Sequence, residues 1–264
     1  NCLMKVRVLS DLHLEFNDDF YLEIPEGDVL ILAGDICLAA DYDNYHPFFE
    51  QCVAKYNKVF YVMGNHEAYH SSIEDTRRIL REKLPKEISL LDNRSEYYLP
   101  EKVHFIGATL WTDFDNKNKD VMDDAREYMN DYHIIDGFTP EKALEEHLNT
   151  REWFERCIPT LKKGKIVVVT HHPPSQSSVK GRYTATRGAY GNNMDSFIQN
   201  HPSISHWVSG HVHHNNDYMI GNTRMISNPR GYYYRHHSFS LISLLSLLVL
   251  LLLLGKGQLS DPTF

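Results

Sequence analysis

The sequence predicts an α/β fold whose first sheet is largely parallel. Residues 29–33 and 59–63 are continuous apolar runs, typical of strands buried on both faces, and a helical segment separates them. Residues 165–170 form a third run of the same kind. Strands that alternate with helices need crossover connections, and these place successive strands in parallel.

The expected elements follow one another regularly in the first half of the chain. Residues 5–9 alternate and are rich in β-branched side chains, which predicts the first strand. A helix is expected over residues 47–56, ahead of the strand at 59–63. Ser72 is a candidate cap for the next helix, and residues 103–107 predict a further strand.

The second half begins with an insertion and ends with a hairpin. Residues 115–136 are acidic and weakly periodic, which predicts a surface insertion. Thr139, followed by proline and glutamate, is a strong helix start. Residues 174–196 have the composition of a long loop. A short strand is expected at 206–209, and Gly-Asn supplies the turn of a hairpin over 218–227.

Composition excludes several classes of protein. The 264 residues suffice for one large domain or two small ones, and 42% of them are hydrophobic. A net charge of −8 disfavours a broad basic surface for duplex nucleic acid. The four cysteines include no C-x-x-C pair, so a zinc-thiolate site is not expected. A reducing, cytoplasmic location is the prediction, and the amino end carries no secretory pattern.

The carboxyl end differs in character from the rest of the chain. Residues 238–255 form an uncharged, leucine-rich stretch of about the minimum length that spans a bilayer. The favoured interpretation is a divergent or frame-shifted tail, and the alternative is a membrane anchor. We therefore predict one domain over residues 4–235 and a tail over 236–264.

Seven side chains with metal-ligating chemistry follow predicted strands or glycine turns. Asp-x-His and His-x-His place two ligands on one side of an extended backbone, and Gly-Asn-His-Glu offers an amide oxygen beside a histidine. A lone Asp-x-His or Gly-Asp is common by chance and Gly-Asn-His-Glu is a stronger signal, but the joint occurrence of all the patterns in this order is not expected by chance. The candidates are Asp11, His13, Asp35, Asn65, His171, His211 and His213. His172 is an alternative to His171, which lies nearer its strand end.

These five motifs resemble the calcineurin-like metallophosphoesterase superfamily. That family combines Asp-x-His, Gly-Asp, Gly-Asn-His-(Asp/Glu), a histidine at a strand end and Gly-His-x-His, and every block is present between Asp11 and His213. Segments at 108–112, 130–132 and 228–232, together with Thr-His-His-Pro-Pro-Ser, are similar to its bacterial and phage branch. The leucine-rich tail departs from the family pattern, which usually closes with another strand.

The resemblance implies a fold and a ligand assignment. The fold would be a four-layer α-β-β-α sandwich with two packed mixed sheets. Two metal ions would be bound, and Mn, Fe and Zn all suit the donor types. Asp35 would bridge the ions; Asp11, His13 and His213 would hold the first, and Asn65, His171 and His211 the second.

The implied activity is hydrolysis of phosphomonoesters or phosphodiesters by a hydroxide that bridges the two ions. His66 would be the catalytic residue, since it is not needed as a ligand. Glu67 either orients His66 or is a first-turn acid. Arg182 and Arg230 are candidate substrate contacts, although exposed loop arginines are an equally good interpretation.

Two other functions compete with this one. A nuclease is disfavoured by the acidic charge. A catalytically silent binding scaffold predicts missing ligands, whereas all eight positions are intact. The expected partner is a small phosphoester, with nucleotides among the candidates, and membrane association would depend on the tail. Residues 113–136 and 174–196 are expected to supply the contacts that select a substrate.

Overall fold

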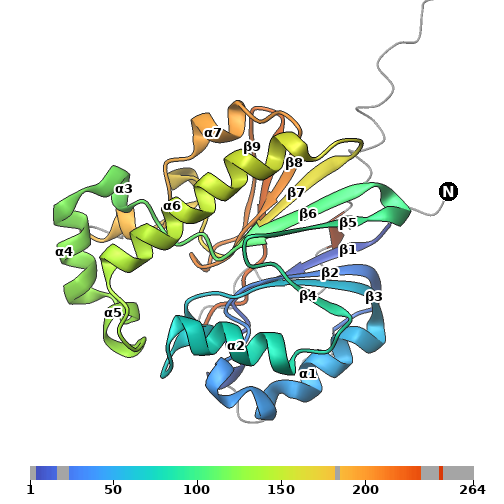
Figure 1. The fold of residues 1–264 in the computed structure, drawn as a ribbon, viewed down its shortest axis with the longest axis horizontal. Coiled ribbons are helices and arrows are strands. Elements are labelled where there is room, and N and C mark those ends of the chain that lie inside the picture. Colours follow the sequence, from blue (N-terminus) through green and yellow to red (C-terminus); the bar gives the residue numbers. More distant parts are fainter. Residues whose placement is uncertain (1–3, 17–23, 182–184, 233–243, 246–264) are drawn as a thin grey trace, which may run out of the picture.

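Two β-sheets lie face to face, and helices cover the outer face of each sheet (Figure 1). The computed structural model describes residues 4–16, 24–181, 185–232 and 244–245. The resulting order of layers is helix, sheet, sheet, helix, which confirms the predicted four-layer α/β sandwich.

The first sheet is parallel except at one edge. Its spatial order is β11-β1-β2-β3-β4, and β11 alone runs antiparallel to its neighbour. The strands are β1 (Val6–Leu9), β2 (Gly27–Ala33), β3 (Tyr56–Val62), β4 (Ile88–Leu90) and β11 (Leu244–Leu245).

The second sheet has a parallel centre and antiparallel edges. Its order is β5-β6-β7-β8-β10-β9, with both outer pairs antiparallel. The strands are β5 (Arg94–Tyr98), β6 (Val103–Ala108), β7 (Lys165–Thr170), β8 (Ile204–Val208), β9 (Asn216–Ile220) and β10 (Thr223–Ser227). Both sheets are therefore mixed, as expected.

The helices form three groups. Helices α1 and α2 cover the first sheet, α6 and α7 cover the second, and α3 to α5 project beyond one end of the sandwich (Figure 1). Their bounds are α1 (Tyr42–Lys55), α2 (Ile73–Lys83), α3 (Phe114–Lys117), α4 (Lys119–Tyr128), α5 (Asp131–Ile134), α6 (Pro140–Cys157) and α7 (Asp195–Gln199).

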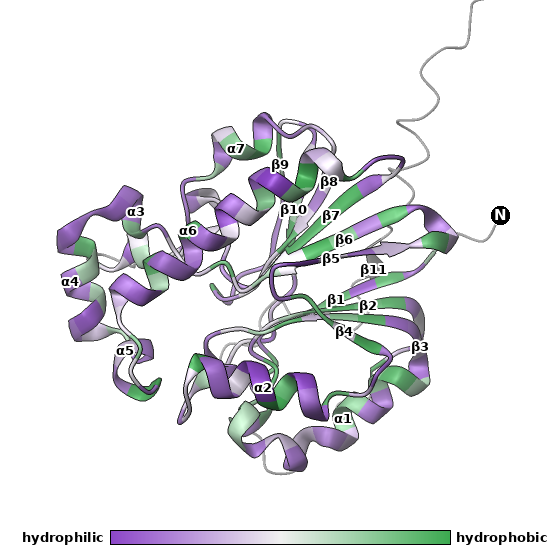
Figure 2. Cartoon of the chain, in the orientation of Figure 1, coloured by the Kyte–Doolittle hydropathy of each residue, from purple (hydrophilic) through white to green (hydrophobic). Residues whose placement is uncertain are grey.

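Alternating side chains divide the core into layers. On β2, Val29 and Ile31 face the other sheet, while Leu30 and Leu32 pack on the helical side. Between the sheets, the Phe60 and Phe105 rings stack with their centroids 4.1 Å apart. The central strand β2 is therefore apolar on both faces. In Figure 2 the inner strands are mostly green, whereas the helices carry much purple.

Two predicted segments differ from the structure. Helix α1 begins at Tyr42, so Pro47 lies inside it rather than at its start. Buried Tyr42 stacks on Phe49 with 5.3 Å between centroids, and this contact favours the earlier helical turn. The insertion at 115–136 contains three short helices, because its apolar residues, such as Ala125, pack onto the core.

The carboxyl tail is described at two residues only. Leu245 and Leu244 pair with Val6 and Arg7 at the edge of the first sheet. The rest of 236–264 lies outside the described residues, so the domain boundary near 235 stays a prediction. Within the part of the chain that the structure describes, no helix has the length and apolarity needed to cross a membrane.

Candidate metal centre

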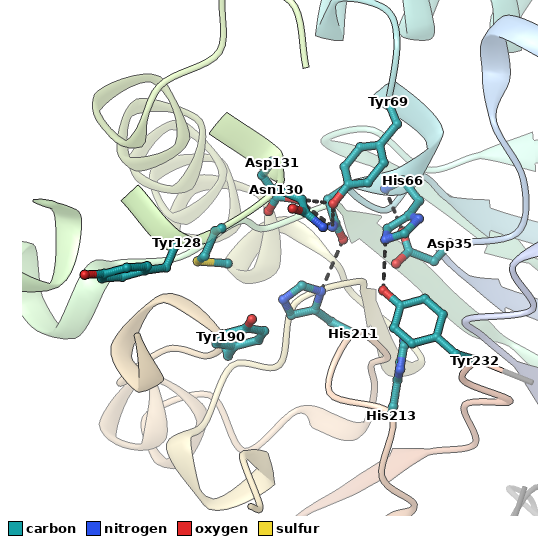
Figure 3. Close-up of a pocket in the computed structure, with 12 residues that line it drawn as sticks. Asp35, His66, Tyr69, Tyr128, Asn130, Asp131, Tyr190, His211, His213 and Tyr232 are labelled. Carbon is teal, nitrogen blue, oxygen red and sulfur yellow. Dashed lines mark hydrogen bonds between the residues drawn. The ribbon is translucent and has the colours of Figure 1, made fainter. Parts of the chain in front are cut away.

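Loops at one end of the two sheets carry all seven candidate ligands. Asp11 and His13 follow β1, Asp35 follows β2, and Asn65 follows β3. The second sheet supplies His171 after β7, and His211 and His213 after β8. The carboxyl ends of parallel strands meet at the same edge of a sheet, so the packed sheets bring these side chains together. Figure 3 shows Asp35, His211 and His213, which come from two of these loops.

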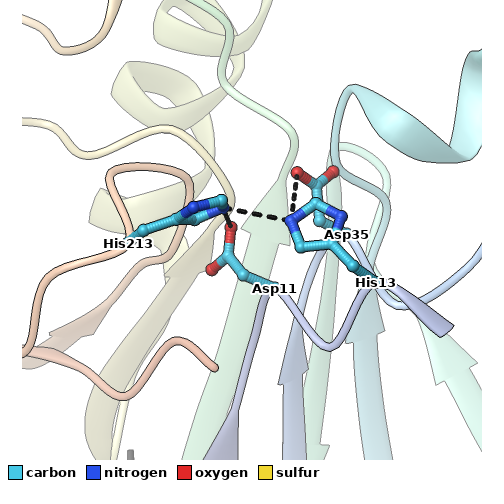
Figure 4. A group of neighbouring side chains, drawn as sticks. All are labelled: Asp11, His13, Asp35 and His213. Atoms are coloured by element: carbon cyan, nitrogen blue, oxygen red, sulfur yellow. Dashed lines mark hydrogen bonds and ion pairs between the residues drawn. The ribbon is translucent and has the colours of Figure 1, made fainter. Parts of the chain in front are cut away.

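The first cluster contains Asp11, His13, Asp35 and His213, whose nearest ligand atoms all lie within 4.8 Å of one another (Figure 4). The Nε2 atoms of His13 and His213 face each other at 3.0 Å. His213 Nε2 lies 3.3 Å from Asp11 Oδ1, and His13 Nε2 lies 3.8 Å from Asp35 Oδ2. Two converging ring nitrogens beside two carboxylates form a donor set that suits a transition-metal ion.

The second cluster contains Asp35, Asn65, His171 and His211. Asn65 Oδ1 lies 3.0 Å from His171 Nε2 and 3.2 Å from His211 Nδ1. His171 Nε2 is also 3.3 Å from Asp35 Oδ2. The other nitrogen of His171, Nδ1, donates to the carbonyl oxygen of Ala33 at 2.8 Å, which keeps Nε2 directed into the cluster.

His172 points away from both clusters. Its Nδ1 is 3.4 Å from the Thr109 carbonyl oxygen, and its ring packs between Trp111 and His211. Burial, followed by the charge of His171, lowers the pKa of His172 to about 3. Of the two adjacent histidines, the structure therefore brings His171 to the clusters.

Five of the seven candidates have backbone angles that side chains rarely adopt. Their φ values are positive: Asp11 50°, His13 47°, Asp35 53°, His211 70° and His213 51°. Each such residue costs on the order of 1 kcal/mol and persists only where the surrounding structure enforces it. Backbone strain of this kind concentrates at functional sites.

The two buried carboxylates are held in the ionised form. Burial raises the pKa of Asp35, but the charges of His171, His66 and His13 lower it by a larger amount. The pKa of Asp35 therefore lies well below its usual value. The pKa of Asp11 is also lowered, since His213 outweighs the effect of burial. Both groups therefore present negative oxygen atoms to the clusters.

His66 lies beside these two clusters and forms a third group of metal-ligating side chains with His13 and Glu15. Its backbone N–H donates to Asp35 Oδ1 at 2.9 Å, while its Nδ1 is 3.0 Å from Glu15 Oε1. Its Nε2 is 3.3 Å from the Tyr232 hydroxyl. Burial lowers the pKa of His66, but Asp35 and Glu15 raise it to about 9.

The Glu67 carboxylate connects the ligand loops. It accepts hydrogen bonds from the backbone N–H groups of Asp35, Ile36 and Gly64, at 3.0, 2.9 and 2.7 Å. The Tyr61 hydroxyl donates to it at 2.7 Å. The orientation of His66 that was considered for Glu67 is supplied by Glu15 instead.

Comparison with known proteins identifies the chain. The profile of the calcineurin-like phosphoesterase family matches residues 4–215, which include all of the candidate ligands. The chain belongs to this family. The family is metal-dependent, and the two clusters suit a metal site.

The phosphoesterase has relatives of known sequence and structure. An uncharacterized protein of Acanthamoeba polyphaga mimivirus is 28% identical over 268 residues, covering 89% of this chain and 94% of the relative. The crystal structure of phosphopantetheinyl hydrolase from Mycobacterium tuberculosis is similar with a TM-score of 0.71 at 17% identity, covering 98% of each chain. A dimetal phosphatase from Danio rerio has a TM-score of 0.51 at 12% identity, covering 86% of this chain and 87% of that one.

A cavity of about 230 Å³ opens beside the metal-ligand candidates of the phosphoesterase. Helices α4 and α5 and the loop around Tyr190 form its outer wall (Figure 3). Its lining residues are Asp35, Asn65, His66, Tyr69, Tyr128, Met129, Asn130, Asp131, Tyr190, His211, His213 and Tyr232. The insertion and the long loop thus reach the site, as the sequence predicts.

The predicted substrate arginines lie elsewhere or are not described. The backbone N–H of Arg230 donates to the Ser10 carbonyl oxygen at 3.0 Å, and Arg230 does not line this cavity. Arg182 lies outside the described residues. The substrate roles expected for both residues stay predictions.

Sequence reasoning missed several residues of the site, among them Glu15, Asp131 and Tyr232. Glu15 was recognisable, because it follows His13 at the alternating spacing that also relates His13 to Asp11. Asp131 and Tyr232 gave no local signal, since their neighbours Asn65 and His66 are far away in sequence. Asp131 lies in a segment noted only for its likeness to one family branch.

Proposed function

We propose that this phosphoesterase hydrolyses small phosphoesters at a two-metal centre in which Asp35 is the shared ligand. One observation carries the proposal: Asp35 Oδ2 lies 3.8 Å from His13 Nε2 in the first cluster and 3.3 Å from His171 Nε2 in the second. The remaining ligands would be Asp11, His13 and His213 for one ion, and Asn65, His171 and His211 for the other.

The chain's own residues would prepare the reaction in three ways. Two bound ions would supply an acidified water and offset charge on the phosphoryl oxygens. The strained loops hold the ligands in place before the ions arrive, and Glu67 ties together the loops that follow β2 and β3. Glu15 holds His66 Nδ1, so Nε2 faces the cavity and can donate a proton to the departing oxygen.

The cavity supports a small leaving group with polar and aromatic character. Tyr69, Tyr128, Tyr190 and Tyr232 contribute rings to its lining, and Asn130 contributes an amide. Aromatic rings suit a flat group such as a nucleobase, so nucleotides are among the candidate substrates. The name of the structurally similar hydrolase adds phosphopantetheinyl esters to the set worth testing.

The test is a substrate panel combined with metal analysis. Metal-free protein is reloaded with Mn²⁺, Zn²⁺ or Fe²⁺ and assayed on p-nitrophenyl phosphate, its bis ester, nucleotides and a phosphopantetheinyl ester. We expect turnover that requires metal and disappears with a chelator. Asp35→Asn should weaken the binding of both ions by at least tenfold, since it removes charge from both clusters.

Asp120→Asn provides a matched control on the exposed surface of α4. It removes one acidic charge far from the ligands and should leave metal content and turnover unchanged. Retention of two ions by Asp35→Asn would contradict the shared-ligand assignment. Binding of two ions without hydrolysis of any ester would favour the silent scaffold instead.

A further inference from the structure

Asp131 connects the insertion to a candidate metal ligand. It is the first residue of α5 and is 2% exposed. Its Oδ1 accepts a hydrogen bond from Asn65 Nδ2 at 2.8 Å and another from the Tyr69 hydroxyl at 2.7 Å. A buried carboxylate that contacts the back of a ligand amide is placed to control how that amide is oriented.

We propose that Asp131 is a positioning residue that fixes the side-chain amide of Asn65 with its oxygen toward the second cluster; this rests on the proposed function. An amide has one end that donates and one that accepts, and only its oxygen can ligate a cation. Asp131 Oδ1 accepts hydrogen bonds from both of its partners, so it faces the NH₂ end of the Asn65 amide.

The opposite orientation would be unfavourable at both ends of the amide. Asn65 Oδ1 now faces His171 Nε2 at 3.0 Å and His211 Nδ1 at 3.2 Å. A flip would place the NH₂ group against the cation site and the oxygen against the buried Asp131 carboxylate. Two acceptor oxygens would then face each other in a buried site, with no hydrogen bond between them. Asp131 therefore holds the oxygen forward.

The same carboxylate links the second cluster to the cavity wall. Tyr69, its other hydrogen-bond partner, stacks on the His66 ring with 4.1 Å between centroids and 24° between planes. The residues directly before Asp131, Tyr128 to Asn130, line the cavity. A leaving group bound against this wall would therefore contact residues that directly precede Asp131 in the chain.

The experiment compares metal affinity across substitutions at position 131. Mn²⁺ and Zn²⁺ are titrated into metal-free protein in competition with a chelating indicator, which reports each ion without any substrate. Asp131→Ala should weaken one of the two ions by 10- to 100-fold and leave the other within about threefold. Asp131→Asn retains an acceptor oxygen in the same place, so its affinity should stay within about threefold of the wild-type value.

Two further variants separate positioning from general damage. Tyr69→Phe removes the longer contact of Asn65 Nδ2 with the Tyr69 hydroxyl, at 3.4 Å, and keeps the 2.8 Å contact with Asp131, so it should bind both ions within about threefold of the wild-type affinity. Asp120→Ala alters the exposed part of the same insertion and should have no effect. Turnover by Asp131→Ala should recover as metal concentration rises, because the lesion is in affinity rather than in chemistry.

Several results would overturn the assignment. Wild-type affinity for both ions in Asp131→Ala would show that the carboxylate does not position Asn65. Equal weakening by the Asn and Ala variants, or weakening by Asp120→Ala, would point to a different cause. The metal titration needs no turnover, so failure of the phosphoesterase proposal would appear separately, as an absence of hydrolysis in wild-type protein with both ions bound.

Discussion

Three histidines at the metal centre differ in the group that accepts a hydrogen bond from the outward-facing ring nitrogen, Nδ1. His171 Nδ1 is bonded to a backbone carbonyl, whereas the Nδ1 atoms of His13 and His66 share Glu15 Oε1 at 3.1 and 3.0 Å. Each of these acceptors keeps a proton on Nδ1 and directs Nε2 inward. Glu15 therefore orients one candidate ligand and the proposed acid together.

Replacing His66 with alanine tests its catalytic role. His66 lies outside the two assigned ligand clusters and groups instead with His13 and Glu15. His66→Ala should lower kcat by about 10²- to 10⁴-fold while two ions remain bound. Elemental analysis of the purified variant gives the metal content. His133→Ala, on the exposed face of α5, should keep wild-type turnover. Loss of metal from His66→Ala would show that the assigned role is wrong.

A histidine remote from the site should contribute to the loss of stability in acid. His147 on α6 is buried, its Nδ1 lies 3.2 Å from the Leu110 carbonyl oxygen, and burial lowers its pKa to about 4. The unfolded chain, with a histidine pKa of about 6.5, binds more protons below that pH. The contribution of neutral, buried His147 to the free energy of unfolding is therefore fully present above pH 6.5 and is lost as the pH falls toward 4.

Urea unfolding at pH 7 and pH 5 measures this loss. His147 should account for a decrease of about 2 kcal/mol in the unfolding free energy between these pH values, and His147→Gln should remove that part. His46→Gln, at a half-exposed position on α1, controls for the removal of an imidazole from the protein surface. An unchanged slope in His147→Gln would contradict the linkage.

Site residues that are close together in the sequence could be predicted, whereas those that meet only in the folded chain could not. Asp11 and His13, or His211 and His213, are paired by alternation along one stretch of backbone, so sequence alone predicts them. Asp131 meets Asn65 only because the insertion folds back over the loop after β3. No local pattern records such a contact.

At the scale of elements, the positions where strands end and loops begin determine where the candidate ligands lie. The strands were predictable because their apolar runs end at the ligand motifs, and the structure places β2, β3 and β7 within a few residues of the predicted ranges. The start of α1 and the helices of the insertion could not be predicted, because the packing of Tyr42 and Ala125 overrides weak local helix preferences.

Gly64, at the end of β3, should tolerate no side chain. A Cβ atom there would overlap Asp35 Oδ1 and lie 2.6 Å from the Asp35 backbone nitrogen. Gly64→Ala should therefore displace the shared carboxylate and weaken the binding of both ions by tenfold or more. The chelator titration measures this effect directly.

Gly137→Ala is the matched control for Gly64→Ala. Gly137 has a φ of 61°, but an added Cβ would meet only Lys142 Nζ, at 3.9 Å. The variant should lose about 1 kcal/mol of stability through backbone strain and retain its metals. Normal metal affinity in Gly64→Ala would show that Asp35 can move without consequence.

At the scale of the whole molecule, packing of one sheet on the other creates the metal centre. The first sheet contributes four of the seven candidates and the second contributes three, so neither sheet has a complete set. The four-layer arrangement was predictable from family resemblance. The pairing of Leu244 and Leu245 with β1 was not, because a uniform leucine run carries no register signal.

Removal of the tail should leave the centre functional. All candidate ligands and all residues that line the cavity lie at or before Tyr232. A chain truncated after Tyr234 should therefore bind metal and turn over substrate as the full chain does. Sedimentation of both chains with lipid vesicles tests the anchor interpretation. Loss of metal binding on truncation would place the tail within the functional unit.

The positive φ values of the ligand loops limit how far the motifs can be transplanted. Five of the seven candidates keep disfavoured backbone angles only because two sheets clamp the loops on either side. A short peptide with the same motifs would relax to ordinary angles and scatter its side chains. Grafting this chemistry onto another protein therefore requires copying the backbone path as well as the residues.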